Sequence, residues 1–281
     1  MPGLPEAEIM RRDLEKEVLG RRIKEATVRP GRNCMKILPR HGRRKEFSDL
    51  LVGTKIGPVG RVGKVLYLDL DNGHSLLVDL GTSASMTKTS ATEEIGPHTH
   101  VVIGFTIGGQ LRIVDPKLTA DVYVAPRDEL ERLREGPGFA LDPFASPLTW
   151  RHFSALLAEH DVTMRDLLMD DRFICGLGPI YSDEILFASG IRHDRRSNQL
   201  GAQDVRRLYR GLMETLQDAL RARGTTYGEH RFRDLHGSPG LYQIEFKVFE
   251  RTGEACRRCR HEVVEEEANG GVTYFCPQCQ T

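Results

Sequence analysis

Several features are scarce or missing in this sequence, and each absence argues against a class of protein. No apolar run approaches the roughly 20 residues that a membrane-spanning helix needs. The first residues include Glu6, Glu8, Arg11 and Arg12, where a signal peptide would be apolar. We therefore expect a cytoplasmic protein that does not contact a membrane.

The sequence also lacks a net charge, because 40 Lys and Arg residues balance 40 Asp and Glu residues. A net charge of zero argues against a protein that coats nucleic acid by means of a large positive net charge. The charge is nevertheless uneven, since residues 1–45 hold thirteen Lys or Arg against six Asp or Glu, a net charge of +7. Such a segment is either a footprint for phosphate or a solvated face. Within it, residues 40–45 (RHGRRK) are expected to form a basic loop of unknown purpose.

Cysteine is scarce too, with six residues, and their spacing favours a metal site over disulfides. Four of them form the pattern C-x2-C-x16-C-x2-C, namely Cys256, Cys259, Cys276 and Cys279. Two such pairs can place four thiolates tetrahedrally around one structural zinc ion, without an open position for chemistry. The other two, Cys34 and Cys175, are expected to be packed or loop thiols, and His98 with His100 makes a weak metal pair.

The order of periodic segments predicts an α+β protein of two domains with a small appendage. Apolar residues at helical spacing predict a helix from Glu6 to Leu19, ended by Gly20. Two hairpins with turns at 71–73 and 108–109, and a strand at 122–124, predict a β-sandwich. Residues 126–147 read as a linker with a short helical piece at 129–134. Helices are expected at 150–160, at 164–169 with Thr163 as N-cap, from Pro179 to Ala188, and over 205–219.

The chain begins Met1-Pro2-Gly3-Leu4-Pro5-Glu6, and a proline behind the initiator methionine has two interpretations. It can simply begin a helix, because a first turn needs no N–H donor. Alternatively, removal of Met1 would expose a secondary amine at Pro2, which can attack a sugar carbon and hold the product as a Schiff base. A following helix N-terminus would favour bound phosphate.

Taken together, these segments resemble the formamidopyrimidine-DNA glycosylase and endonuclease VIII family of base-excision enzymes. The resemblance spans nearly the whole chain. It is carried by the start of the chain, Gly63-Lys64, Leu80-Gly81, Asp115-Pro116, Gly178 with residues 180–184 (IYSDE), and residues 274–280 (YFCPQCQ). It implies a helix-two-turn-helix element before Ile180, a β-hairpin zinc finger, and DNA held in a cleft between the two halves.

The resemblance also implies a mechanism and its residues. Pro2 would attack C1′ of a flipped-out damaged nucleoside, expel the base, and support β and δ elimination of the strand. Glu6 would lie near the opened sugar, although a favourable first-turn charge explains it equally. Lys64 would hold a phosphate, although an exposed strand lysine is the commoner explanation. Further DNA contacts are expected at Lys117, Arg172 and Tyr181.

Several positions depart from the family pattern. Gly3 replaces the glutamate that acts as general acid and base, and such groups are worth about 10²- to 10⁴-fold in rate. Asp79 replaces a histidine, and Thr82 replaces the methionine that fills the gap left by the flipped base. The other departures are Lys117, Leu118 and Thr119 for an arginine with a nearby phenylalanine, Pro179 for a phosphate-binding asparagine, and Gly271 for an arginine of the zinc finger. The finger is acidic, with Glu265, Glu266 and Glu267.

Two interpretations follow. In the first, the protein is a divergent glycosylase and abasic-site lyase whose general acid has moved, with Asp79 or Glu8 as the new carboxylate. In the second, it is an inactive paralogue that binds DNA or a partner, because a flipped-base gap needs bulkier fillers than Thr82 and Leu118. An RNA-directed or purely structural zinc protein has no supporting feature beyond the finger.

We favour the first interpretation. The expected divisions are a catalytic-type domain over 1–125, a linker over 126–148, a DNA-binding domain over 149–235, and a strand with the zinc finger over 236–281. The expected partner is double-stranded DNA with a damaged base or an abasic site. The protein is expected to be a monomer associated with the nucleoid.

Overall fold

The chain folds into two compact units, each of which is built from two separate stretches of sequence. The computed structural model describes residues 3–29, 34–135, 141–146, 148–228, 230–269 and 271–281. The first unit combines Met1–Gly136 with Arg223–Gly240, and the second combines Pro137–Ala222 with Leu241–Thr281. Residues 223–240 therefore pack with the N-terminal unit, although they follow the helical segment in sequence.

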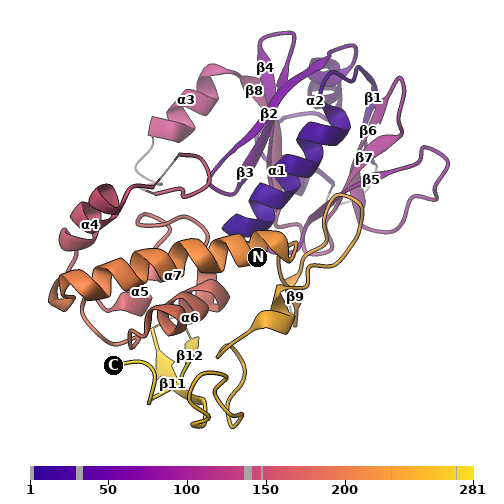
Figure 1. Cartoon of the computed structure of the whole chain (residues 1–281). Coiled ribbons are helices and arrows are strands. Elements are labelled where there is room, and N and C mark those ends of the chain that lie inside the picture. Colours follow the sequence, from indigo (N-terminus) through magenta and orange to yellow (C-terminus); the bar gives the residue numbers. More distant parts are fainter. Residues whose placement is uncertain (1–2, 30–33, 136–140, 147, 229, 270) are drawn as a thin grey trace. The chain divides into compact units, whose positions relative to one another are not determined.

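The first unit consists of two four-stranded antiparallel sheets with helices (Figure 1). Its helices are α1 (Leu4–Val18), η1 (Cys34–Ile37), α2 (Arg44–Leu51) and α3 (Asp128–Glu135). Its strands are β1 (Ile23–Val28), β2 (Ile56–Val62), β3 (Val65–Leu70), β4 (His74–Asp79), β5 (Ser85–Thr89), β6 (Thr99–Phe105), β7 (Gln110–Val114), β8 (Asp121–Pro126), β9 (Thr226–Tyr227) and β10 (His230–Arg231). The sheet orders are β1-β6-β7-β5 and β2-β3-β4-β8, and the predicted β-sandwich is confirmed.

Turn chemistry explains why the two hairpins could be predicted. Gly73 has φ +81° between β3 and β4, and Gly108 and Gly109 have φ +98° and +83° between β6 and β7. These left-handed conformations suit glycine, which lacks a Cβ atom. The expected helix near the start of the chain is α1, and Gly20 follows its end with φ +78°.

Strands β1, β2 and β5 and helix α2 were not predicted, and β2 shows why. Its sequence Ile56-Gly-Pro-Val-Gly-Arg-Val62 contains residues that are unfavourable in strands. Tertiary packing overrides that preference, because the ring of Tyr67 on β3 lies across Gly60. A Cβ atom at residue 60 would lie 2.3 Å from the Tyr67 hydroxyl oxygen. The expected basic loop 40–45 also ends early, because α2 begins at Arg44.

Salt bridges connect residues 223–240 to α1. The guanidinium of Arg223 donates to Asp13 on α1 and to Asp234 within the segment, and both carboxylates are buried. The hydrogen bonds to Asp13 and Asp234 raise the pKa of Arg223, so the charge at this junction is permanent. The segment is thus an integral part of the first unit.

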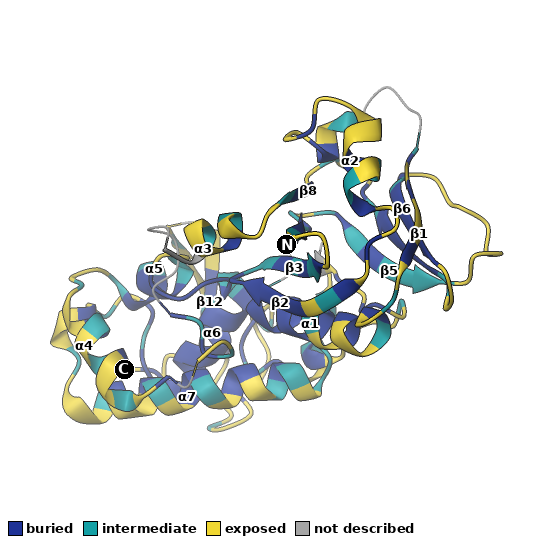
Figure 2. Cartoon of the chain, turned by 90° about the horizontal axis from the view of Figure 1, so that it is seen from above, coloured by how far each residue is buried: buried dark blue, intermediate teal, exposed yellow. Residues whose placement is uncertain are grey.

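The second unit is mainly helical and carries the C-terminal hairpin. Its elements are α4 (Trp150–Ala158), α5 (Met164–Met169), α6 (Gly178–Ser189), η2 (Ser197–Gln199), α7 (Ala202–Arg221), η3 (Tyr242–Glu245), β11 (Val264–Ala268) and β12 (Gly271–Phe275). Thr163 caps α5 as predicted, because its hydroxyl accepts from the Asp166 N–H. The apolar face of α7 is buried and its other face is exposed (Figure 2).

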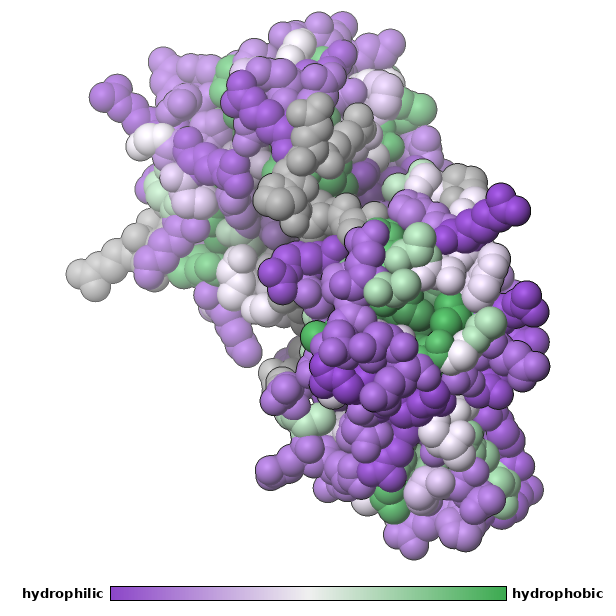
Figure 3. All heavy atoms as spheres, turned by 90° about the vertical axis from the view of Figure 1, so that its left-hand side faces the viewer, coloured by the Kyte–Doolittle hydropathy of each residue, from purple (hydrophilic) through white to green (hydrophobic). Residues whose placement is uncertain are grey.

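One face of the molecule is largely hydrophilic. On the face drawn in Figure 3, apolar side chains form only small groups among hydrophilic ones. Among the residues that the structure describes, no helix is both long enough and apolar enough to cross a membrane.

A buried ion pair connects α5 and α6 to strand β12. The Arg165 guanidinium donates to Asp183 Oδ1 (2.6 Å) and to the Val272 carbonyl (2.7 Å). Asp183 also accepts from the Thr273 hydroxyl and the Tyr274 N–H. Burial raises the pKa of Asp183 to about 6, even though the Arg165 charge and these hydrogen bonds lower it. The pair therefore holds the hairpin against the helices from within the core.

We expect Arg165→Met to lower the free energy of unfolding by about 3–5 kcal/mol, because it leaves a buried charge uncompensated. Arg172→Met is the matched control: its ion pair with Asp170 is exposed, and such changes usually alter stability by about 0.5 kcal/mol or less. Without Arg165, the pKa of Asp183 in the folded state rises further above its unfolded value. The loss should therefore be smallest below about pH 6, where Asp183 is protonated in both folded proteins, and should grow as the pH rises above 6. Urea titrations at several pH values measure it, and equal losses in both variants would contradict the expectation.

Candidate active site and zinc finger

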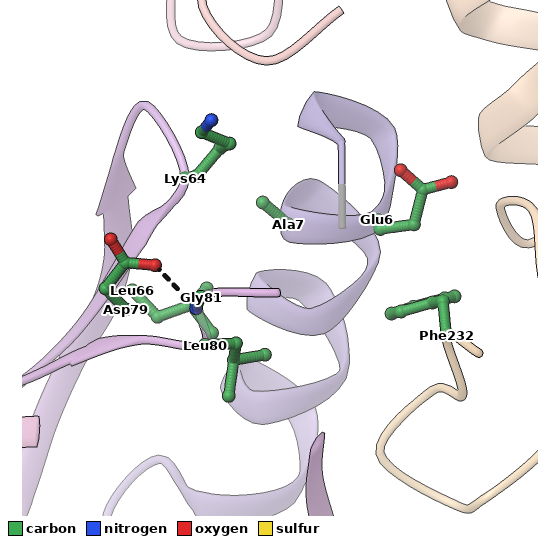
Figure 4. A pocket seen from close by; sticks show the side chains of 8 residues that line it. All are labelled: Glu6, Ala7, Lys64, Leu66, Asp79, Leu80, Gly81 and Phe232. Carbon is green, nitrogen blue, oxygen red and sulfur yellow. Dashed lines mark hydrogen bonds between the residues drawn. The ribbon is translucent and has the colours of Figure 1, made fainter. Parts of the chain in front are cut away.

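A pocket lies at the start of α1 in the first unit (Figure 4). Lys64 extends from the turn between β2 and β3, Asp79 from the end of β4, and Glu6 from α1. The remaining lining residues are Ala7, Leu66, Leu80, Gly81 and Phe232. The structure thus brings together two residues that the sequence predicted, Glu6 and Lys64. Pro2, the predicted nucleophile, lies outside the described residues, which begin at Gly3.

Glu6 is held by backbone N–H groups on both of its carboxylate oxygens. Oε2 accepts from the Gly3 N–H and Oε1 from the Thr225 N–H, each at 2.8 Å. The residue is 3% exposed. Donors of this kind stabilise the ionised carboxylate and fix its position. Glu6 therefore connects the beginning of α1 to segment 223–240.

Asp79, the other carboxylate of the pocket, accepts from one backbone N–H group, whereas Glu6 accepts from two. Its Oδ1 accepts from the Gly81 N–H at 2.9 Å, and the residue is half-buried. Gly81 permits this turn because it adopts φ +56°, and a Cβ atom there would lie 2.2 Å from the Thr119 carbonyl oxygen. The Asp79 carboxylate is consequently placed beside the pocket by the Leu80-Gly81 turn.

Glu8, the other carboxylate considered as a general acid, is enclosed by three arginines. It accepts from Arg11, Arg12 and Arg61, and the Arg61 Nε lies 2.8 Å from Glu8 Oε2. Burial alone would raise the pKa of Glu8, but these hydrogen bonds outweigh it and hold the pKa below its ordinary value. A carboxylate that stays ionised in this way is a poor proton donor.

The loop after β7 is organised by Asp115, which is completely buried. Its carboxylate accepts from the backbone N–H groups of Lys117, Thr119 and Ala120. The loop presents Leu118 in the left-handed region, with φ +58°. This is a strained conformation for leucine, and such strain is often found where a side chain contacts a ligand. Lys117, a predicted DNA contact, is exposed on the same loop.

The other two predicted DNA contacts belong to the second unit. Arg172 is exposed and its guanidinium pairs with Asp170. Tyr181 is 3% exposed, and its ring packs 5.6 Å from that of Tyr242, measured between centroids. DNA contacts at Arg172 and Tyr181 stay predictions.

The four predicted zinc ligands cluster at the base of the β11–β12 hairpin. The four Sγ atoms all lie within 4.8 Å of one another. Sγ–Sγ distances are 3.9 Å for Cys256–Cys279 and 3.5 Å for Cys259–Cys276. Four sulfurs about 2.3 Å from a tetrahedral zinc would be about 3.8 Å apart. Cys256, Cys259, Cys276 and Cys279 therefore fit one structural zinc ion.

The acidic residues of the hairpin are partly neutralised within the second unit. Glu266 accepts from Arg192, and its Oε2 lies 3.0 Å from His193 Nε2. Glu265 accepts from the Thr252 hydroxyl. Because neighbours in a strand point to opposite faces, Glu266 faces away from Glu265 and Glu267. The acidic run is thus distributed over both faces of the hairpin.

Loss of the metal should unfold the finger selectively. Structural zinc contributes about 10–16 kcal/mol to small domains of this kind, and residues 250–281 bury few apolar side chains besides Val263, Phe275 and the cysteines. We expect Cys276→Ser, or treatment with a chelator, to abolish amide protection from hydrogen exchange over β11 and β12 while the β-sandwich stays protected. Cys175→Ser, at a buried cysteine outside the cluster, is the control. Unchanged protection in a metal-free protein would contradict a structural role.

Three models of known protein domains match this chain. Residues 1–122 match the model of the formamidopyrimidine-DNA glycosylase N-terminal domain, and residues 139–230 match that of its H2TH domain. Residues 253–281 match the zinc finger found in FPG and IleRS. The chain belongs to the formamidopyrimidine-DNA glycosylase family. The resemblance, the α+β fold class and the zinc finger predicted from the sequence are confirmed.

Relatives in this family match along the whole chain. The formamidopyrimidine-DNA glycosylases of Pelotomaculum thermopropionicum and Bacillus licheniformis are each 31% identical over the full chain and 99% of their own length. A Lactococcus lactis Fpg in complex with DNA that contains an abasic site superposes with a TM-score of 0.87, at 26% identity over 99% of both chains. The Thermus thermophilus MutM (Fpg) protein gives a TM-score of 0.82, at 30% identity over 99% of this chain and 98% of its own.

Sequence reasoning missed two parts of the pocket. Phe232 lines it, and the Thr225 N–H holds Glu6, but both residues lie more than 200 positions from α1 in sequence. No local pattern marks them. The Arg61–Glu8 pair was missed for the same reason, since its partners are 53 residues apart.

Proposed function

We propose that this protein is a divergent base-excision DNA glycosylase and abasic-site lyase that acts through Pro2. The observation that supports this best is the pocket at the start of α1, which Glu6, Lys64 and Asp79 all line. Membership of a DNA glycosylase family gives the reaction class.

The proposed chemistry needs a free amine at Pro2 after removal of Met1. The amine nitrogen forms a bond to C1′ of the damaged nucleotide, and the base leaves with the electron pair of the glycosidic bond and a proton. The sugar ring opens as its oxygen takes a proton, which leaves an iminium ion between Pro2 and C1′. Loss of a C2′ proton then expels the 3′ phosphate, and a second elimination expels the 5′ phosphate.

We propose that Asp79 supplies the proton transfers that Gly3 cannot. Glu6 is committed to two backbone N–H groups, and Glu8 is held ionised by three arginines. Asp79 lines the same pocket and is bound through Oδ1 by the Gly81 N–H. It is therefore the carboxylate that best fits a general acid and base for the opened sugar.

The remaining predictions stay part of this proposal. Lys64 would bind a phosphate beside the damaged nucleotide, and Lys117, Arg172 and Tyr181 would contact double-stranded DNA. The protein would act as a monomer, with residues 1–125 in the catalytic-type domain. The DNA-binding domain would lie within 149–222, because residues 223–235 of the expected range 149–235 belong to the first unit. The protein would associate with the nucleoid.

Borohydride trapping tests the proposal directly. A duplex with a single abasic site is incubated with the protein and reduced, and the adduct is mapped by mass spectrometry. A covalent bond from the sugar to the nitrogen of Pro2, in a chain without Met1, is expected. An adduct on a lysine, or none at all despite DNA binding, would exclude the proposed nucleophile.

Lyase activity should exceed base removal. Imine formation with an already opened sugar needs less acid assistance than expulsion of a base, so loss of the glutamate at position 3 should slow excision more. We expect single-turnover rates on abasic duplex to exceed those on duplexes with oxidised or ring-opened purines by at least about tenfold, within the range of one general acid. Faster release of a damaged base would contradict this order.

A second candidate function is a DNA-binding paralogue without excision. It is supported by Gly3 and by the small, exposed Thr82 at the position of a gap-filling side chain. This candidate predicts tight binding to abasic duplex with neither nicking nor a trapped adduct.

A further inference from the structure

The basic segment 40–45 has no part in the pocket described above, yet it carries an unusual concentration of unpaired charge. The side chains of Arg43, Arg44 and Lys45 are exposed and make no ion pair with any residue that the structure describes. Arg43 is the N-cap residue of α2, and Arg44 and Lys45 are the first two residues of the helix. The backbone N–H groups of such a first turn have no partner within the helix. Arg40 differs, because it pairs with Asp121 and Glu129 and stacks on Tyr123.

A buried histidine lies beneath this turn. The side chain of His41 is 4% exposed, and its Nε2 accepts from the Val124 N–H at 3.0 Å. With Nε2 as the acceptor, the ring proton of a neutral imidazole must be on Nδ1. That Nδ1 has no hydrogen-bond partner in the described part of the chain. A buried donor without an acceptor is unfavourable, so the position favours a ligand with an oxygen.

The group that faces this donor is the carboxylate of Glu46. Its Oε1 lies 3.7 Å from His41 Nδ1, too far for a hydrogen bond, while Oε2 accepts from the Gly42 N–H at 3.2 Å. The side chain is 54% exposed and is therefore able to rotate into solvent. Glu46 thus places a negative group loosely at the helix N-terminus, facing the buried imidazole and within one turn of chain from the three unpaired cations.

We propose that the first turn of α2 is a phosphate-binding site at which the Glu46 carboxylate stands in for the ligand. A phosphate would displace this carboxylate, accept from His41 Nδ1 and the Gly42 N–H, and be neutralised by Arg43, Arg44 and Lys45. The phosphate is either a free ion or a phosphodiester of a nucleic acid backbone. Because none of these residues lines the pocket at the start of α1, the inference does not depend on the proposed function.

The first experiment uses the full-length protein and inorganic phosphate as the probe. Imidazole signals of ¹⁵N-histidine-labelled protein are followed by NMR during titration with phosphate, with chloride added to a control sample at equal ionic strength. Saturable movement of the His41 Nδ1 signal is expected. Glu46→Gln should tighten phosphate binding by about tenfold, because it removes a competing charge.

One double variant and a matched control test the cation cluster. Arg43→Gln combined with Arg44→Gln should weaken phosphate binding by about tenfold or more. Lys24→Gln combined with Arg151→Gln, two exposed cations elsewhere, changes the net charge equally and should leave it unaltered. The same four proteins are then titrated with an undamaged duplex at several salt concentrations. The quantity compared is the slope of the logarithm of the duplex binding constant against the logarithm of the salt concentration. If this slope is shallower by about one unit or more in the Arg43/Arg44 variant, the bound phosphate is a phosphodiester of the duplex. If the slope is unchanged, the ligand is free phosphate.

Distinct results would overturn the inference. If the His41 signal does not move with phosphate or with duplex, or if Glu46→Gln and the Arg43/Arg44 variant bind both probes as the parent does, the site does not exist. Failure of the borohydride experiment alone would leave this inference intact.

Discussion

A dipeptide extension in front of Pro2 should abolish strand cleavage at abasic sites. It converts the secondary amine into an amide, whose nitrogen lone pair is delocalised and cannot attack C1′, while every side chain stays unchanged. We expect the single-turnover rate to fall by at least about 10³-fold, as is typical when a covalent nucleophile is removed.

The control for this extension is the affinity of the protein for DNA. Binding to a duplex with a non-cleavable abasic analogue should stay within a few-fold of the parent, measured by fluorescence anisotropy. Undiminished cleavage by the extended protein would mean that another amine, such as a lysine, is the nucleophile. Lys64 would then be the first residue to test, because it lines the same pocket.

Asp79→Asn should lower the rate of base removal by about 10²- to 10⁴-fold, the usual contribution of a general acid and base. The amide preserves the size of the side chain and can still accept from the Gly81 N–H through its oxygen, so folding should be little affected. Asp79→Glu should recover part of the rate. Single-turnover rates of base release from a duplex with a damaged base, compared between the parent and the two variants, give the measurement.

Two matched variants separate this role from a general effect of charge. Asp121→Asn removes a carboxylate from the residue directly opposite Asp79 in the β4–β8 pairing, and Asp121 does not line the pocket. Glu8→Gln tests the other carboxylate that the sequence suggested. Turnover that persists in Asp79→Asn but falls in Glu8→Gln, with stability unchanged, would reverse the assignment.

Features of the fold that depend on neighbouring residues could be predicted from the sequence, whereas features that depend on contacts between distant residues could not. Local signals were reliable: Gly73 and Gly108 marked the hairpins, Thr163 marked the start of α5, and four cysteines at fixed spacing marked the zinc site. Strand β2 was missed because the packing of Gly60 against Tyr67 is a tertiary effect.

The candidate site was predicted only in part, for the same reason. Glu6 and Lys64 stood in recognisable motifs at the start of the chain and before β3, and the structure places both in one pocket. The contacts that fix them are distant in sequence, as the Thr225 N–H on Glu6 shows. The difference between Glu8 and Asp79 also depended on geometry, because three arginines converge on Glu8 from α1 and β2.

The ionic junction of Arg223 with Asp13 and Asp234 bears on how this protein can be made. The N-terminal unit is completed by residues 223–240, so a nascent chain must be translated past position 240 before that unit can close. A gene fragment that stops at residue 136 would yield α1 with its buried Asp13 deprived of Arg223 and its buried Glu6 deprived of the Thr225 N–H. Attempts to express the β-sandwich half by itself should therefore give aggregated material, unless the later segment is joined to it by a short artificial loop.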